Sequence, residues 1–367
     1  MKKLNAAILK IDNGHTHYII ESILANEDFN VVAVSLSPES VHTFYSYFGN
    51  RFDKIPIYDN DEEVFKNHSV DFALLGGTNK EHYEQFKLCI EHGANMLSMK
   101  IPTLNEREYA EICRGLEEKK LCCAIELEMR WHCEVLRVKD LVKSGAIGKV
   151  LSFNAYNYSH FPTWVRWMTD PDDSYGRVVP IKRGEKRYRG GALTDHPHIF
   201  DLIRFIFDCN VKRVYAAVAP NMRKEQCVED MIYVIGEMEN GVIFSLDPSY
   251  ANKEKNDVVV AMDEDFSKFP RPVEVGLCVH GEKGSVIADV YGSDALSFAL
   301  KGSEDFKIWE AHPAFDDDRL AMMKRVVAMI RGEIPDTTRE FFKDYGNVMK
   351  FINRAYESVS SGEIIEI

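Results

Sequence analysis

The sequence predicts a chain of class α/β plus α+β, with a doubly wound parallel sheet first and an open, mostly antiparallel sheet second. Two observations predict this fold. Over the first 125 residues, short and nearly continuous apolar runs alternate with helical patterns, as in a parallel sheet covered on both faces. After about residue 126, apolar and polar residues alternate between turn signals, which is typical of antiparallel strands. We therefore expect one domain over residues 1–125 and another over residues 126–367.

The N-terminal half is expected to alternate strands and helices. Ser37-Pro38 is a good helix start, because serine caps a helix and proline favours its first position. Gly93 is a good helix end. The expected strands are Leu4–Ile11, Asn30–Leu36, Asp71–Leu75, Ala94–Ser98 and Leu121–Ile125, and the expected helices are around Ile19–Leu24, from Ser37, Glu81–His92 and Glu106–Glu118.

The C-terminal half is expected to begin with an amphipathic helix and to continue as sheet. Glu239-Asn240-Gly241 and Gly281-Glu282-Lys283-Gly284 are hairpin signals. One face of this sheet is expected to be covered by helices, and the two final helices are expected to pack back on the body. The expected helices are Val135–Val142, Arg319–Arg331 and Glu340–Ser360, and the expected strands are Lys149–Tyr158, Val211–Val218, Met231–Glu239, Val242–Ser249, Val273–His280, Ser285–Val290 and Phe306–Glu310.

Composition and charge restrict the class of partner. The 367 residues include 45 basic and 58 acidic side chains, so the formal net charge is −13. A negative chain argues against nucleic-acid and anionic-membrane partners, which are bound through positive surface. No apolar run approaches the ~20 residues that span a bilayer. The N-terminus shows no signal-peptide pattern and the eight cysteines are unevenly spaced, so we expect a cytoplasmic protein that binds a small molecule.

The first strand-to-helix turn, Ile11 to His17, is where a dinucleotide pyrophosphate sits in such a fold. It holds one glycine, Gly14, so the G-x-G-x-x-G fingerprint is absent. The turn is either a modified phosphate loop, with Gly14 and the amides of His15 and Thr16 as donors, or an ordinary turn that binds nothing. Asp12 would repel a pyrophosphate unless it points away.

The end of the second strand carries no acid for the adenine-ribose hydroxyls. Ser37 and its neighbouring serines could instead bond a 2′-phosphate. This favours NADP slightly over NAD, and it equally fits a loss of cofactor binding.

A second candidate group follows the glycine pair Gly190-Gly191. Asp195, His196, His198 and Asp201 fall within seven residues. If the segment is helical, Asp195 and His198 lie one turn apart on the same face, as do His198 and Asp201. Such a group suits proton transfer, since histidine titrates near neutrality, and it could also ligate a metal. The alternative is a capping aspartate beside structural histidines.

Two further features are weaker by themselves. Lys100 stands at the carboxyl end of a parallel strand, where ligands of open α/β sheets bind, although most lone lysines are solvated. A basic stretch from Arg177 to Arg189 follows Trp164 and leads into Gly190. It is either a solvated loop or a substrate lid, in which aromatic rings stack on a sugar while Arg183 and Arg187 clamp an anionic group.

Together these segments resemble the Gfo/Idh/MocA family of glucose-fructose oxidoreductase and inositol dehydrogenase-like proteins, over nearly the whole chain. The best match is Ser144-Gly145-Ala146-Ile147-Gly148-Lys149-Val150, which resembles the family's S-G-x-I-G-x-V. The other matching segments are Asp71–His82, His92–Lys100, Gly190–Arg204, Gly281–Ser285 and Tyr356–Gly362.

The resemblance implies a Rossmann domain that binds NAD or NADP, a second domain for substrate and oligomer contacts, and a homodimer or homotetramer. It implies that Lys100 contacts substrate and nicotinamide, that His198 is the general acid/base beside Asp195, and that Asp201 is structural. No metal site is expected. The expected cofactor-binding residues are Asn13, Gly14, His15, Thr16, Ser37, Thr78, Asn79, His82 and Lys100, and the expected substrate-binding residues are Lys100, Arg130, His160, Trp164, Arg183, Arg187, Asp195, His196 and His198.

The sequence departs from the family pattern at the cofactor and catalytic positions. The glycine loop is reduced to Gly14, Met-Lys-Ile-Pro replaces Glu-Lys-Pro, and Asp195 and His198 are three apart instead of four. Asn79 stands where proline is usual. The expected function is an NAD(P)-dependent oxidoreductase acting on a sugar, a cyclitol or a related polyol, including an anionic one. The alternatives are a non-catalytic ligand-binding or regulatory protein and, third, a metal-dependent lyase or isomerase that uses Asp195, His196 and His198.

Overall fold

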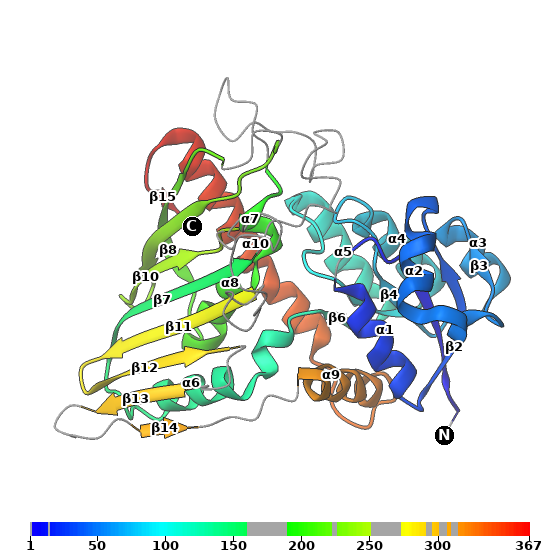
Figure 1. Ribbon diagram of the computed structural model, residues 1–367, viewed down its shortest axis with the longest axis horizontal. Coiled ribbons are helices and arrows are strands. Elements are labelled where there is room, and N and C mark those ends of the chain that lie inside the picture. The colour runs from blue at the N-terminus through cyan, green and yellow to red at the C-terminus, as the bar shows by residue number, and fades with distance from the viewer. Residues whose placement is uncertain are drawn as a thin grey trace, which may run out of the picture. The chain divides into compact units, whose positions relative to one another are not determined.

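The computed structural model describes residues 2–13, 15–159, 189–221, 226–250, 273–290, 296–300, 307–309 and 315–367 (Figure 1). The chain forms two compact units. Unit 1 contains residues 1–128 and 314–346, and unit 2 contains residues 129–313 and 347–367.

Unit 1 is built on a parallel sheet. Within the described residues its strands lie in the order β3-β2-β1-β4-β5-β6, so the strand order reverses between β1 and β4. Ligands of open α/β sheets bind at such a reversal, outside the carboxyl ends of the strands. The strands are β1 (Leu4–Leu9), β2 (Phe29–Ser35), β3 (Ile57–Tyr58), β4 (Phe72–Leu75), β5 (Asn95–Ser98) and β6 (Cys123–Ile125).

The helices of unit 1 come from both ends of the sequence. Helix α9 (Phe315–Ile330) packs against α1 (Thr16–Ala25), and its Met322 and Met323 join the same buried cluster as Ile19 and Ile20. The domain boundary expected at residue 126 assigned this helix to the second domain, whereas its contacts place it in unit 1. The remaining helices are η1 (Pro38–Ser40), α2 (Val41–Phe48), η2 (Gly49–Phe52), α3 (Asp61–Asn67), α4 (His82–His92), α5 (Glu106–Lys119) and the first turns of α10 (Thr338–Ser361).

Unit 2 contains a mixed sheet. In the described ranges the strand order is β14-β13-β12-β11-β7-β10-β9-β8-β15, and every neighbouring pair is antiparallel except β7 and β10. The strands are β7 (Val150–Ser159), β8 (Val211–Val218), β9 (Ile232–Met238), β10 (Ile243–Asp247), β11 (Val273–Gly281), β12 (Gly284–Asp289), β13 (Leu296–Leu300), β14 (Lys307–Trp309) and β15 (Ile365–Glu366).

Helices cover one face of this sheet, as Figure 1 shows. Phe351 of α10 contacts both Phe200 of α8 and Phe244 of β10, so these three rings join the helices to the sheet. The opposite face is exposed, because residues such as Tyr233 and Ile235 alternate along β9 with the buried Ile232 and Val234. The other helical elements are η3 (Glu128–Trp131), α6 (Cys133–Lys143), α7 (Ala192–Asp195) and α8 (His198–Phe207).

The predicted fold class is confirmed, and the two expected hairpins join β9 to β10 and β11 to β12. The expected elements fall within a few residues of the observed ones. The elements that were not predicted include β3, α3, β13 and β15, which are short or lie at sheet edges. None of the described helices is both long enough and apolar enough to cross a membrane.

One helical expectation is wrong. The segment from Asp195 to Asp201 is not one helix, because α7 ends at Asp195 and α8 begins at His198. His196 lies between them with φ −111° and ψ 53°, outside the helical region, and Pro197 precedes α8. Asp195 and His198 therefore do not lie one turn apart on a single helix. His198 and Asp201 do share α8.

Candidate functional site

At the reversal of strand order in unit 1, a backbone hydrogen bond joins the turn after β1 to the segment after β4. The N–H of Asn13, in the turn after β1, donates to the carbonyl of Gly76, just after β4, at 3.0 Å. The N–H of Gly76 donates in turn to Leu9 at 2.8 Å. A Cβ at position 76 would lie 2.4 Å from the carbonyl oxygen of Lys10 and 2.5 Å from Cγ2 of Thr16. Only glycine allows these segments to approach so closely.

Three of the predicted site residues meet at this edge. The side-chain amide of Asn13 donates to the carbonyl of Lys100 at 3.3 Å, and Nδ1 of His82 donates to the carbonyl of Ile101 at 2.8 Å. Lys100 and His82 are buried, and burial lowers the pKa of His82 to about 4. A neutral His82 and Asn13 therefore fix the backbone that carries Lys100.

The loop amides expected to bind phosphate have partners inside the loop. The N–H of His15 donates to Oδ1 of Asn13 at 3.2 Å, and the N–H of Thr16 donates to the Asn13 carbonyl at 3.1 Å. The turn is therefore held in shape by Asn13. A ligand that used these two amides would have to replace the bonds to Asn13.

Asp12 points away from the loop amides and toward the end of β2. Its carboxylate accepts a hydrogen bond from Ser37 at 2.7 Å and another from Ser40. Burial raises the pKa of Asp12, and the two hydroxyl bonds oppose that rise. The structure thus places an acid from the first turn at the end of β2, where the sequence alone showed none.

Thr78 and Asn79 follow β4 at the same edge of the sheet. The backbone N–H and the hydroxyl of Thr78 both donate to Glu81 at 2.8 Å, and Glu81 forms an ion pair with Lys10. Asn79 is buried. These contacts bind the segment before α4 to the turn after β1.

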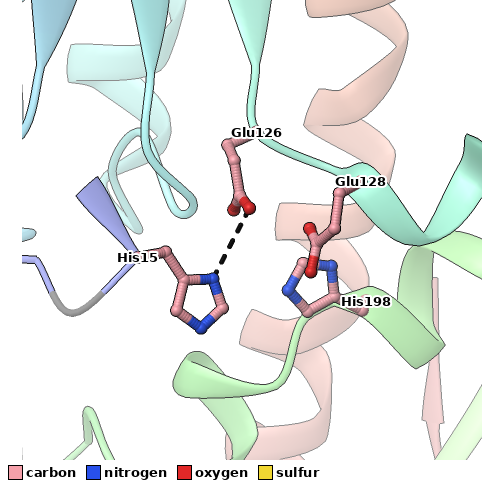
Figure 2. A group of neighbouring side chains, drawn as sticks. All are labelled: His15, Glu126, Glu128 and His198. Atoms are coloured by element: carbon pink, nitrogen blue, oxygen red, sulfur yellow. Dashed lines mark ion pairs between the residues drawn. The ribbon is translucent and has the colours of Figure 1, made fainter. Parts of the chain in front are cut away.

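A buried charged cluster lies at the carboxyl end of β6, and its acids were not among the predicted site residues. Glu126 Oε1 lies 3.5 Å from Nδ1 of His15, as the dashed line in Figure 2 marks. Arg319 of α9 lies 3.8 Å from Glu126 and 3.6 Å from Glu128. Burial favours the neutral form of Glu126, but His15 and Arg319 outweigh it and lower its pKa to about 2. Two acids directly after a parallel strand were the sequence signal that could have identified this cluster.

In unit 2 the predicted residues Asp195 and His196 form side-chain hydrogen bonds, and His198 is buried at the start of a helix. Asp195 accepts a hydrogen bond from the Tyr250 hydroxyl at 2.9 Å. His196 donates from Nδ1 to the carbonyl of Pro248 and accepts at Nε2 from Ser159 at 2.9 Å. Both ring nitrogens of His196 are engaged, so neither is left for a metal. His198 is buried in the first turn of α8.

Glu229 organises the glycine pair before α7. Its carboxylate accepts hydrogen bonds from the N–H groups of Gly191 at 3.2 Å and Leu193 at 3.1 Å, and from the Tyr356 hydroxyl at 2.7 Å. A Cβ on Gly191 would lie 2.0 Å from the Glu229 carbonyl oxygen. Gly191 is therefore required by close packing in front of the helix that carries Asp195.

Arg130 has a structural partner. Its Nε and Nη2 donate to the two oxygens of Asp201 at 2.5 and 2.6 Å, and Asp201 is buried. Such a two-point ion pair is strong and directional. It connects η3 to α8, so the structure gives the predicted substrate contact Arg130 a partner inside unit 2.

The remaining predicted residues lie outside the described part of the chain. They are Gly14, His160, Trp164, Arg183 and Arg187.

Comparisons with known proteins identify the C-terminal part. Residues 135–287 match the model of the GFO/IDH/MocA C-terminal domain. The predicted resemblance to the Gfo/Idh/MocA family is confirmed.

The proteins that this chain resembles are oxidoreductases by name. The scyllo-inositol 2-dehydrogenase (NADP⁺) IolW of Bacillus subtilis is 20% identical over 81% of this chain and 79% of its own length. An uncharacterised oxidoreductase of Schizosaccharomyces pombe is 25% identical, but over only 35% of this chain and 36% of its own length. An oxidoreductase from Agrobacterium radiobacter, solved with NAD⁺, L-tartaric acid and magnesium, shares the fold with a TM-score of 0.77 at 16% identity, covering 100% of this chain and 98% of its own.

We predict that His82 makes the protein sensitive to acid. Its folded pKa of about 4 lies below the ordinary 6.5, so its contribution is complete above pH 6.5 and is lost as the pH falls toward 4. The loss is on the order of 3 kcal/mol. His82→Asn keeps a donor for Ile101 but removes the titration. Urea unfolding at pH 7 and pH 4.5 should therefore show a smaller fall in stability for the variant than for wild type. Equal falls would contradict the assignment.

We predict that the Arg130–Asp201 pair acts as a unit. Removing one partner leaves a buried charge, which costs about 3–5 kcal/mol. Arg130→Met and Asp201→Asn should each lower the unfolding midpoint strongly, and the double variant should lose much less than the sum of the two. Additive losses in a denaturation cycle would show that the pair does not have this structural role.

Proposed function

We propose that this protein is an NAD-dependent oxidoreductase that moves a hydride between nicotinamide and the hydroxyl-bearing carbon of a polyol or hydroxy acid. The observation that carries the proposal is the assembly of Asn13, His82 and Lys100 at the reversal of strand order in unit 1. The inositol and tartrate named for the relatives support a small, hydroxyl-rich substrate. A non-catalytic ligand-binding protein on the same scaffold is the alternative.

The residues of unit 1 fit the nucleoside end of a dinucleotide. Asp12 and Ser37 stand at the end of β2, where a ribose is held by an acid in this kind of fold. Because residue 76 is glycine, no side chain from the segment after β4 crowds the turn after β1. These residues would hold the adenosine, while Asn13, Thr78 and His82 would shape the edge toward Lys100.

The hydrogen bonds of Asp12 favour NAD over NADP. The slight preference for NADP rested on Ser37 and its neighbours as donors to a 2′-phosphate, but Ser37 and Ser40 both donate to Asp12. Asp12, Asp61 and Glu81 also surround Lys10 with negative charge. A 2′-phosphate brought to this position would meet carboxylates, whereas ribose hydroxyls could donate to them.

The chemistry assigned to the chain is a proton exchange beside the hydride transfer. A bound nicotinamide supplies the hydride acceptor or donor. We assign Lys100 to orienting the reacting hydroxyl, His198 to exchanging its proton, and Asp195 to holding the substrate. Arg183 and Arg187 remain predicted contacts for an anionic substrate.

We propose a homo-oligomer that forms through the exposed sheet face of unit 2. Strand pairing aligns side chains of six strands in one row on this face. Ile235 and Ile287 in that row are 51% and 53% exposed, and Ile243 on the same face is 63% exposed. Large apolar side chains exposed on one sheet face, here interrupted by Ser245 and Asn154, are typical of a protein interface. The row contains Tyr215, Ile235, Ser245, Asn154, Cys278 and Ile287.

The nucleotide proposal predicts that the protein binds NADH at least about tenfold more tightly than NADPH, a difference of roughly 1.4 kcal/mol. Fluorescence titration of the purified protein with each nucleotide measures this ratio. Asp12→Asn removes the carboxylate charge and should bring the ratio of NADH affinity to NADPH affinity closer to one, mainly by improving NADPH binding. Asp71→Asn, at the opposite edge of the same sheet, is the control and should leave the ratio unchanged.

The titration distinguishes failure of the oxidoreductase proposal from a wrong choice of nucleotide. If neither nucleotide binds, the oxidoreductase proposal fails. If NADPH binds more tightly than NADH, only the choice of nucleotide is wrong. Tight binding of NADH without turnover of any inositol or hydroxy acid would favour the non-catalytic alternative.

The oligomer proposal predicts that Ile235→Glu lowers the mass measured by light scattering from a multiple of 42.1 kDa toward a single chain. Leu136→Glu is the matched control, because Leu136 is a similarly exposed apolar residue on α6 and not on the sheet. A wild-type mass of 42.1 kDa would refute the proposal.

A further inference from the structure

The His15–Glu126–Glu128 cluster of unit 1 is not used by the proposed hydride transfer. His15 precedes α1, Glu126 directly follows β6, and Glu128 begins η3. Figure 2 shows the three side chains, and their candidate ligand atoms lie within 4.8 Å of one another. Figure 2 also labels His198, which belongs to unit 2.

Glu126 is the unusual member of this cluster. It has no exposed surface, and neither of its oxygens accepts a hydrogen bond within the described structure. Its nearest basic groups, His15 at 3.5 Å and Arg319 at 3.8 Å, lie at ion-pair distances. A buried carboxylate ordinarily requires close donors or a metal to compensate for lost water.

Arg319 is a charged side chain shared by the two carboxylates of the cluster. Its guanidinium lies 3.8 Å from Glu126 and 3.6 Å from Glu128, and it lies over the Tyr18 ring at 4.8 Å. A metal ion at the centre would take the carboxylates as ligands, and Arg319 would remain as an outer partner of both.

We propose that His15, Glu126 and Glu128 bind a divalent metal ion of the Zn²⁺ and Mn²⁺ class. One imidazole nitrogen and two carboxylate oxygens suit these ions better than Mg²⁺ or Ca²⁺, which prefer all-oxygen sites. Ligands at ~2.1 Å from a tetrahedral ion stand roughly 3.4 Å apart, so the observed spread closes by small side-chain rotations. Three protein ligands leave a position open to solvent or to a ligand oxygen.

The test is metal binding by the full chain, without any nucleotide. Protein stripped with EDTA and dialysed is titrated with ZnCl₂ and with MnCl₂ by calorimetry, and bound metal is counted by mass spectrometry. We expect one ion per chain, and at least a tenfold loss of affinity in Glu126→Gln and in His15→Ala. Glu134→Gln, an equally buried carboxylate outside the cluster, should bind as wild type does.

A second ligand variant and a structural readout keep the result interpretable. Glu128→Gln serves if Glu126→Gln does not fold, as judged by circular dichroism. Cobalt substitution should give visible absorption bands that the His15→Ala variant alters. No bound metal in wild type, or affinity unchanged by all three ligand variants, would overturn the proposal. Because NADH is absent, this result is independent of the nucleotide titration.

Discussion

The edge of unit 1 on which the proposed function depends is held together by Asn13. Its backbone N–H crosses from the turn after β1 to Gly76 after β4, its side-chain amide reaches the carbonyl of Lys100 after β5, and its oxygens accept the amides of His15 and Thr16. One buried residue thus connects the ends of three parallel strands. In a Rossmann sheet these ends are where a ligand binds.

That role explains how a turn with one glycine can retain its shape. In the usual fingerprint, glycines let the backbone approach a pyrophosphate and the helix behind it. Here the close approach is provided by Gly76, on the neighbouring strand, while Asn13 stabilises the turn. The cost is that the His15 and Thr16 amides are already engaged, and that Asp12 and Glu126 bring negative charge to the same edge.

The fold could be predicted because its signals are local. Buried strands such as Phe72–Leu75 are continuous apolar runs, and Asn240-Gly241 marks a hairpin. The site could be predicted only where a residue follows a strand, as Asn13 and Lys100 do. Partners far apart in sequence gave no local signal, so the Asp201 partner of Arg130 and the Arg319 partner of Glu126 required the structure. The structure was also needed to place α9 in unit 1, because α9 packs against α1, which is far from it in sequence.

The central claim is that the carboxyl edge of β1, β4 and β5, organised by Asn13, binds a nicotinamide dinucleotide. A crystal structure of the protein grown with NADH tests it most directly. We expect the adenosine ribose hydroxyls to lie within hydrogen-bond distance of Asp12 and the nicotinamide to lie beside Lys100. NADH bound at another edge of the sheet, or crystals that hold no NADH at saturating concentration, would contradict it.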